Sequence, residues 1–212
     1  MNNTMILDRL NEILTVKGIT TFEAVENFKN DVLRLVEADE AKKHGIGETL
    51  KVFKKIEQNG LKKTSLYGGA MFKTENGVAV CDTYVIFEYT GGDIPGIDRE
   101  SLPKEPEFVT MNLKRTDSIN YRDFISVEMP VYSELKQAIS KRKAELKGIR
   151  NADRRAIIPI DGTGIDKFGI NAEYALMARR CGAEEFKISQ KGKCYVSKTE
   201  NMNILICGAY MR

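Results

Sequence analysis

The chain has no tryptophan, only one histidine and only four cysteines among its 212 residues. The cysteines contain no Cys-x-x-Cys pair, and His44 lies far from them in the sequence, so no metal site is predicted. Cysteines that are neither paired nor clustered are typical of a reducing compartment, where they behave as small apolar core side chains. These four are Cys81, Cys181, Cys194 and Cys207.

Long hydrophobic runs are also missing. No stretch approaches the roughly 18–20 unbroken apolar residues of a membrane span. The first apolar stretch is interrupted by Asp8, Arg9 and Glu12, and the residues before it carry no positive charge, which is unlike a signal peptide. We therefore expect a cytoplasmic protein without membrane association.

No catalytic constellation is recognisable. The glycine-rich stretch Asp161–Asp166 lacks the Lys-Ser/Thr of a P-loop and is too short for a dinucleotide fingerprint, so a tight turn is expected there. Asp82 has no base or metal partner nearby in the sequence, and His44 follows two lysines at a predicted helix end. The sequence predicts a protein that is not an enzyme and needs no cofactor. General acid–base chemistry does not require histidine, however, and stays open.

The hydrophobic period alternates between that of helices and that of strands, which predicts an α+β fold. Helices are expected in residues 1–45, at about 47–58 (stopped by Asn59-Gly60), at 131–147 and at 172–181. Strands are expected at 65–73, 78–81, 84–89, 107–114, 121–128, 156–160, 167–170, 184–189, 193–198 and 203–210. We interpret residues 1–45 as a helical extension and residues 46–212 as an α+β domain, with two units at about 46–128 and 129–212. Its sheets should be antiparallel, with helices on one face.

Positive charge is concentrated on the predicted helices. Residues 136–155 hold eight bases and two acids. Solvated helix faces are often basic, but a cluster of cations also attracts polyanions. The candidate DNA-binding residues are Lys51, Lys54, Lys55, Lys141, Arg142, Lys143, Arg179 and Arg180.

Residues 166–212 resemble the C-terminal unit of a bacterial DNA sliding clamp. The similar parts are Ile170–Leu176, where a strand enters a helix, and the end of the chain with Ile204–Ile206 and Met211-Arg212. Residues 50–89 resemble the first unit of such a clamp, through Leu66–Phe72, Asn76-Gly77 and Val80–Val85. The order helix then three strands occurs in both stretches.

The resemblance implies a non-enzymatic processivity factor of DNA replication. Its inner helices would bind duplex DNA non-specifically, and an outer pocket would hold a peptide of a DNA polymerase or another replication protein. The chain departs from the family in three ways. It is shorter than a full protomer, so it could not encircle DNA as the family's dimer does; residues 1–45 have no counterpart; and Gly208–Arg212 lacks the family's proline.

Three functions are consistent with these observations. The first is a clamp-like DNA-replication accessory that binds duplex DNA through basic helix faces, as a monomer or a homo-oligomer. The second is an interaction or structural protein with a clamp-like fold and no DNA binding, from a phage or mobile element. The third is a small enzyme acting on a phosphorylated or nucleic-acid substrate.

Overall fold

The computed structural model describes residues 21–61, 70–117, 124–149, 153–160, 168–189 and 194–210. The chain divides into two compact units, Met1–Leu50 with Ile94–Asp98, and Lys51–Asp93 with Arg99–Arg212. The expected helix at the start of the 1–45 segment, the first residues of the strand at 65–73 and the turn at 161–164 lie outside the described residues.

The first unit contains helix α2 (Thr21–Lys43) and the start of helix α3 (Gly47–Leu61). Gly45 separates the two helices with a φ of 73°, a left-handed conformation that favours glycine. On α2, the apolar side chains of Val25, Leu33 and Val36 remain 53%, 47% and 43% exposed.

The second unit is built on a seven-stranded antiparallel sheet of order β1-β2-β3-β9-β8-β7-β4. The predicted α+β class is therefore confirmed, with antiparallel sheets. The strands of this sheet are β1 (Met71–Lys73), β2 (Val78–Cys81), β3 (Val85–Tyr89), β4 (Phe124–Glu128), β7 (Glu185–Ser189), β8 (Cys194–Lys198) and β9 (Met202–Cys207).

The strand order contains two helix–three-strand units that meet at the centre of the sheet. One unit is α3 followed by β1, β2 and β3; the other is helix α6 (Ala172–Arg180) followed by β7, β8 and β9. Counted toward the centre of the sheet, one unit runs β1, β2, β3 and the other runs β7, β8, β9. The two runs meet where β3 pairs antiparallel with β9. A twofold axis normal to the sheet would produce this arrangement. Only α6 has a strand directly before it, whereas α3 follows α2.

The last turn of helix α3 packs closely against β2 at Gly60. The expected stop at Asn59-Gly60 is wrong, since the helix continues to Leu61. A Cβ on Gly60 would lie 2.5 Å from the carbonyl oxygen of Cys81 and 2.6 Å from the Cβ of Ala70. Glycine is needed here for the close approach of helix and strand, and does not end the helix.

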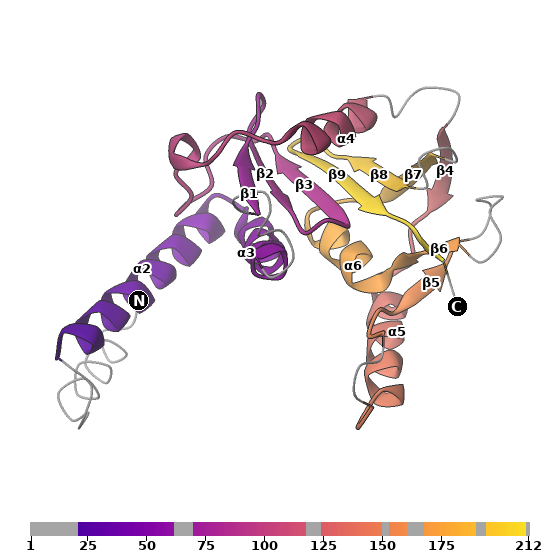
Figure 1. Cartoon of the computed structure of the whole chain (residues 1–212), viewed down its shortest axis with the longest axis horizontal. Coiled ribbons are helices and arrows are strands. Elements are labelled where there is room, and N and C mark those ends of the chain that lie inside the picture. Colours follow the sequence, from indigo (N-terminus) through magenta and orange to yellow (C-terminus); the bar gives the residue numbers. More distant parts are fainter. Residues whose placement is uncertain are drawn as a thin grey trace. The chain divides into compact units, whose positions relative to one another are not determined.

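The strand predicted at 107–114 is wrong, because Glu107–Asp117 forms helix α4. Phe, Val and Thr favour strands, but Val109 and Leu113 stand one helical turn apart and are both buried. They belong to an apolar cluster with Phe72, Ile86 and residues of β8 and β9. Figure 1 shows α4 on one face of the sheet and α3 and α6 on the other, so helices cover both faces and the expectation of helices on one face only is wrong.

A small three-stranded sheet lies on the same side as α6. Its order is β10-β6-β5, with β5 (Ile157–Pro159) and β10 (Ala209–Tyr210) flanking β6 (Phe168–Asn171). Phe168 of β6 stacks on Tyr195 of β8, with ring centroids 5.6 Å apart, so the two sheets share a core. Helix α5 (Tyr132–Glu145) joins β4 to β5 and packs beside α6.

Tyr174 of α6 links the two helix–three-strand units through a buried hydrogen bond. Its hydroxyl donates to Oδ2 of Asp82 at 2.7 Å, and Asp82 is fully buried in the turn between β2 and β3. The neighbouring Thr83 adopts a φ of 79°, a strained conformation for a β-branched residue. Burial is the main cause that raises the pKa of Tyr174, and the hydrogen bond to Asp82 raises it further. Its hydroxyl therefore remains a donor.

Tyr174→Phe should lower the free energy of unfolding by about 1–3 kcal/mol, because the buried carboxyl group of Asp82 loses a donor. Urea denaturation followed by circular dichroism measures this change. Tyr195→Phe is the matched control, since the Tyr195 hydroxyl is buried and finds no partner among the described residues. Removing it should leave stability unchanged or slightly increased. Equal losses in both variants would contradict the assigned role of the Tyr174–Asp82 bond.

Candidate nucleic-acid interface

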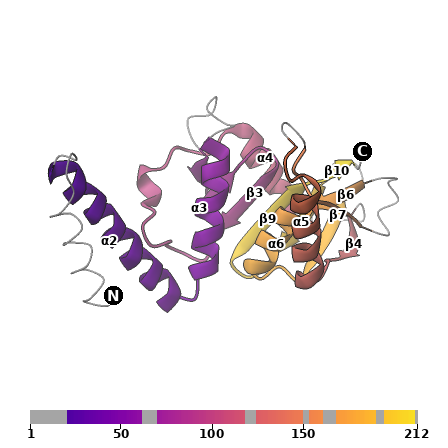
Figure 2. The same ribbon diagram turned by 90° about the horizontal axis from the view of Figure 1, so that it is seen from below.

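Helices α3, α5 and α6 lie on one side of the large sheet, as Figure 2 shows from that side. Together they carry nine lysines and arginines against five glutamates. We call their exposed side the basic helix face, defined by Lys51, Lys54, Lys55, Lys141, Lys143 and Arg180. The eight residues predicted from the sequence all lie on these three helices.

The cations of α3 lie opposite its packed side. Val52, Phe53 and Ile56 are buried, whereas Lys51 and Lys55 are exposed. Lys54 is half-buried. The amphipathic pattern therefore directs the charged ends of these lysines to solvent.

The three predicted cations of α5 differ in their environment. Lys141 and Lys143 are exposed. Arg142 instead bonds to nearby residues. Its guanidinium donates to Glu145 at 3.2 Å and to the carbonyl of Asp153 at 2.6 Å. Arg142 is thus tied to the segment that enters β5 and contributes less to an outer binding surface.

The two consecutive arginines of α6 point in different directions. Arg179 is half-buried, and its guanidinium donates to the carbonyls of Met129 and Pro130, both at 2.9 Å. Arg180 is exposed. The sequence predicted DNA contacts for both, but the structure uses Arg179 to hold the chain just before α5.

Tyr132 was not among the predicted site residues, yet its side chain interacts with two cations. The ammonium of Lys136 lies 4.4 Å from the ring centroid. A hydrogen bond from Arg180 lowers the pKa of the Tyr132 phenol, and a hydrogen bond from Lys136 is the next largest cause. The Tyr-x-x-x-Lys spacing on a helix was the available sequence signal, since it places the two side chains one turn apart. The contribution of Arg180 required the packing of α5 on α6.

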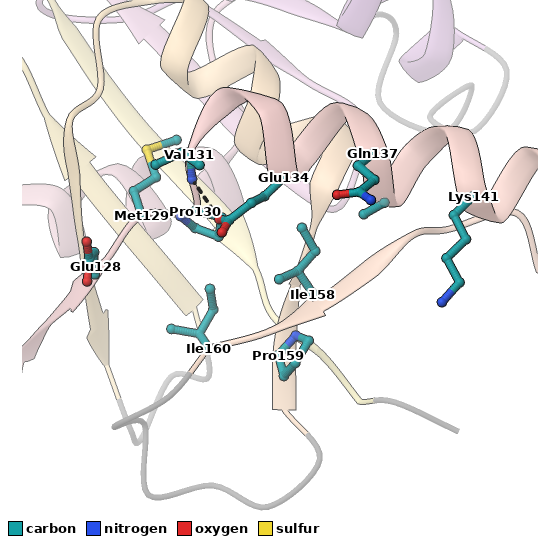
Figure 3. Close-up of a pocket in the computed structure, with 11 residues that line it drawn as sticks. Glu128, Met129, Pro130, Val131, Glu134, Gln137, Lys141, Ile158, Pro159 and Ile160 are labelled. Atoms are coloured by element: carbon teal, nitrogen blue, oxygen red, sulfur yellow. Dashed lines mark hydrogen bonds between the residues drawn. The ribbon is translucent and has the colours of Figure 1, made fainter.

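A groove runs between α5 and β5, with a cavity volume of about 720 Å³. Its lining is mixed, with the apolar residues Pro130, Ile158 and Ile160 beside charged side chains. Glu128 and Glu134 lie toward one end and Lys141 toward the other, as Figure 3 shows. A second cavity of about 450 Å³ shares Lys141 and Ile158 with the first, so the groove continues along α5.

No chemistry is indicated by the remaining candidates. Asp82 is buried and bonded to Tyr174 and to the backbone N–H of Tyr84, as expected of a structural turn residue. His44 follows the end of α2, where its N–H donates to the carbonyl of Glu40. The stretch Asp161–Asp166 lies outside the described residues.

Comparison with protein-family models, with curated proteins and with solved structures gives no match. In the part of the chain that the structure describes, no helix combines the length and apolar character needed to cross a membrane. Within the same residues, no three His, Cys, Asp or Glu side chains are grouped so as to hold a metal ion. The four cysteines are not paired with one another.

Arg179→Ala should destabilise the protein, whereas Arg180→Ala should not. Losing hydrogen bonds from a charged donor to two carbonyls costs about 1–3 kcal/mol of unfolding free energy. An exposed arginine changes stability by less than about 0.5 kcal/mol. Thermal unfolding of the two variants tests the contrast. Equal midpoints would show that the Arg179 bonds contribute little to the fold.

Proposed function

We propose that the chain is a non-catalytic, cytoplasmic DNA-replication accessory that resembles a sliding clamp and binds duplex DNA non-specifically. The observation that carries the proposal is the shared orientation of α3, α5 and α6, which brings cations from three distant segments to one side of the sheet. Duplex DNA is the partner that best fits a broad, positively charged helical surface.

Binding on such a face is electrostatic. Exposed lysines contact backbone phosphates and release condensed counterions, so affinity falls steeply with salt. Backbone contacts carry no information about base sequence, so all duplexes should bind about equally. The contributing residues are Lys51, Lys54, Lys55, Lys141, Lys143 and Arg180; Arg142 and Arg179 support the helices that present them.

The element order supports the clamp-like part of the proposal. Two helix–three-strand units joined through β3 and β9 place α3 and α6 on the same face of one sheet. This is the relation expected if residues 50–89 and 166–212 are two copies of one unit. A polymerase or another replication protein would then be a natural partner, and assembly into a homo-oligomer would extend the DNA-contacting surface.

A second candidate function is an interaction protein without DNA binding, and the groove beside α5 favours it. Apolar lining residues with charges of opposite sign at the ends suit a short protein segment. Ile158→Glu separates the two candidates, because it changes the groove and leaves the cations of the basic helix face intact.

Fluorescence anisotropy with a labelled duplex over a salt series tests the DNA-binding proposal. The logarithm of affinity should fall linearly with the logarithm of salt concentration. Lys55→Ala and Lys141→Ala should each flatten the slope by about 0.9, because each removes one phosphate contact. Two duplexes of unrelated sequence should lose affinity equally.

Lys114→Ala is the matched control for that experiment. Lys114 is exposed on α4, on the opposite face of the sheet. Its replacement should leave the slope unchanged. Absence of binding at low salt, or an equal effect of Lys114→Ala, would remove the basic helix face as a DNA-binding surface.

A further inference from the structure

Tyr132, Lys136 and Arg180 form a cluster where the start of α5 meets the end of α6. Tyr132 is the first residue of α5 and Lys136 lies one turn later, with its ammonium 4.4 Å from the tyrosine ring centroid. Arg180 is the last residue of α6, and it contacts the Tyr132 hydroxyl. All three side chains are exposed, with Tyr132 40% exposed.

The cluster is held in place by the neighbouring Arg179. Its two hydrogen bonds to the carbonyls of Met129 and Pro130 fix the end of α6 against the segment that leads into α5. The end of α6 is also closed by Gly182, whose φ is 85° and whose N–H donates to the carbonyl of Arg179. The backbone positions of Tyr132 and Arg180 are therefore fixed relative to each other.

The three polar groups have complementary roles toward an oxyanion. A guanidinium presents paired N–H donors that match two phosphate oxygens, and an ammonium is a compact positive charge. The phenol hydroxyl adds a neutral donor. The cation–π contact holds Lys136 over the ring, so less side-chain freedom is lost when an anion binds.

We propose that Tyr132, Lys136 and Arg180 form a seat for one backbone phosphate of duplex DNA, which fixes where a strand crosses the basic helix face. The proposal rests on the DNA-binding function proposed above and adds an ordered contact to it. Lys55, Lys141 and Lys143 supply charge from flexible side chains, whereas the seat supplies directed hydrogen bonds. Its ligand is a phosphodiester, the anion whose two free oxygens match the paired N–H donors of a guanidinium and the charge of an ammonium.

The seat is tested by titrating the full chain and its variants with the same labelled duplex. The double variant Lys136→Ala/Arg180→Ala should flatten the salt slope by about 0.9, since together the two cations neutralise the one phosphate of the seat. Tyr132→Phe should weaken binding about threefold to tenfold at every salt concentration and leave the slope unchanged, because the lost donor is neutral. Arg180→Lys should restore the slope of the wild type but not its full affinity, because the paired donors are missing.

The variants must first show the thermal midpoint of the wild type, which their exposed positions predict. If Lys55→Ala weakens binding while Tyr132→Phe and Arg180→Lys both bind like the wild type, the seat is wrong and the DNA-binding face stands. If the wild type binds no duplex at low salt, both proposals fail. Tyr132→Phe separates the seat from a general charge effect, because it changes no charge at neutral pH.

Discussion

The pairing of β3 with β9 is the constraint on which the second unit depends. It brings residues 85–89 and 202–206 together along their whole length, from the pair Val85–Ile206 to the pair Tyr89–Met202. A buried polar pair fixes the register, since Asn203 donates to the carboxyl group of Glu88 at 2.7 Å directly across the two strands. A slip by one residue would separate this pair and would also exchange the faces on which the buried side chains of one strand pack. The position of α6 relative to α3 follows from this register.

The two arginines at the end of α6 show how one short sequence can serve both fold and surface. Successive helical residues point about 100° apart, so one side chain can face the packed interior while the next faces solvent. Arg179 satisfies carbonyls of the segment before α5, and Arg180 remains at the surface beside Tyr132. A substitution at the first position therefore removes the bonds that hold the end of α6 against the segment before α5. A substitution at the second changes the face alone.

Local patterns predicted most of the elements correctly. At α6, for example, Asn171 accepts from the N–H of Glu173 at 3.0 Å and Gly182 follows the helix in a left-handed conformation, which are the usual roles of these residue types at helix ends. Prediction failed where packing overrides local preference. Residues 107–114 form a helix because Val109 and Leu113 fill a cluster on the sheet, and Gly60 stays helical because it touches β2.

The candidate site was predictable in part, for a similar reason. Amphipathic periodicity shows which lysines leave a helix toward solvent, and this places Lys55 and Lys141 correctly. Periodicity cannot show which arginine finds a carbonyl acceptor on another segment, so the role of Arg179 required the structure. Tyr132 acquires a second cation only because α5 and α6 are neighbours.

The outer edge of β5 limits the addition of a strand from another chain to the three-stranded sheet. The carbonyl of Ala156 accepts from Ala172, next to β6, so in an antiparallel ladder Ile158 also faces β6 while Ile157 and Pro159 face outward. Proline has no N–H, and Ile157 is therefore left as the single outward donor of this strand. An extended chain that approached from this side would find too few partners to continue the ladder. The three-stranded sheet is thereby protected from growth by strand addition at β5, and Pro159 acts as a safeguard against aggregation.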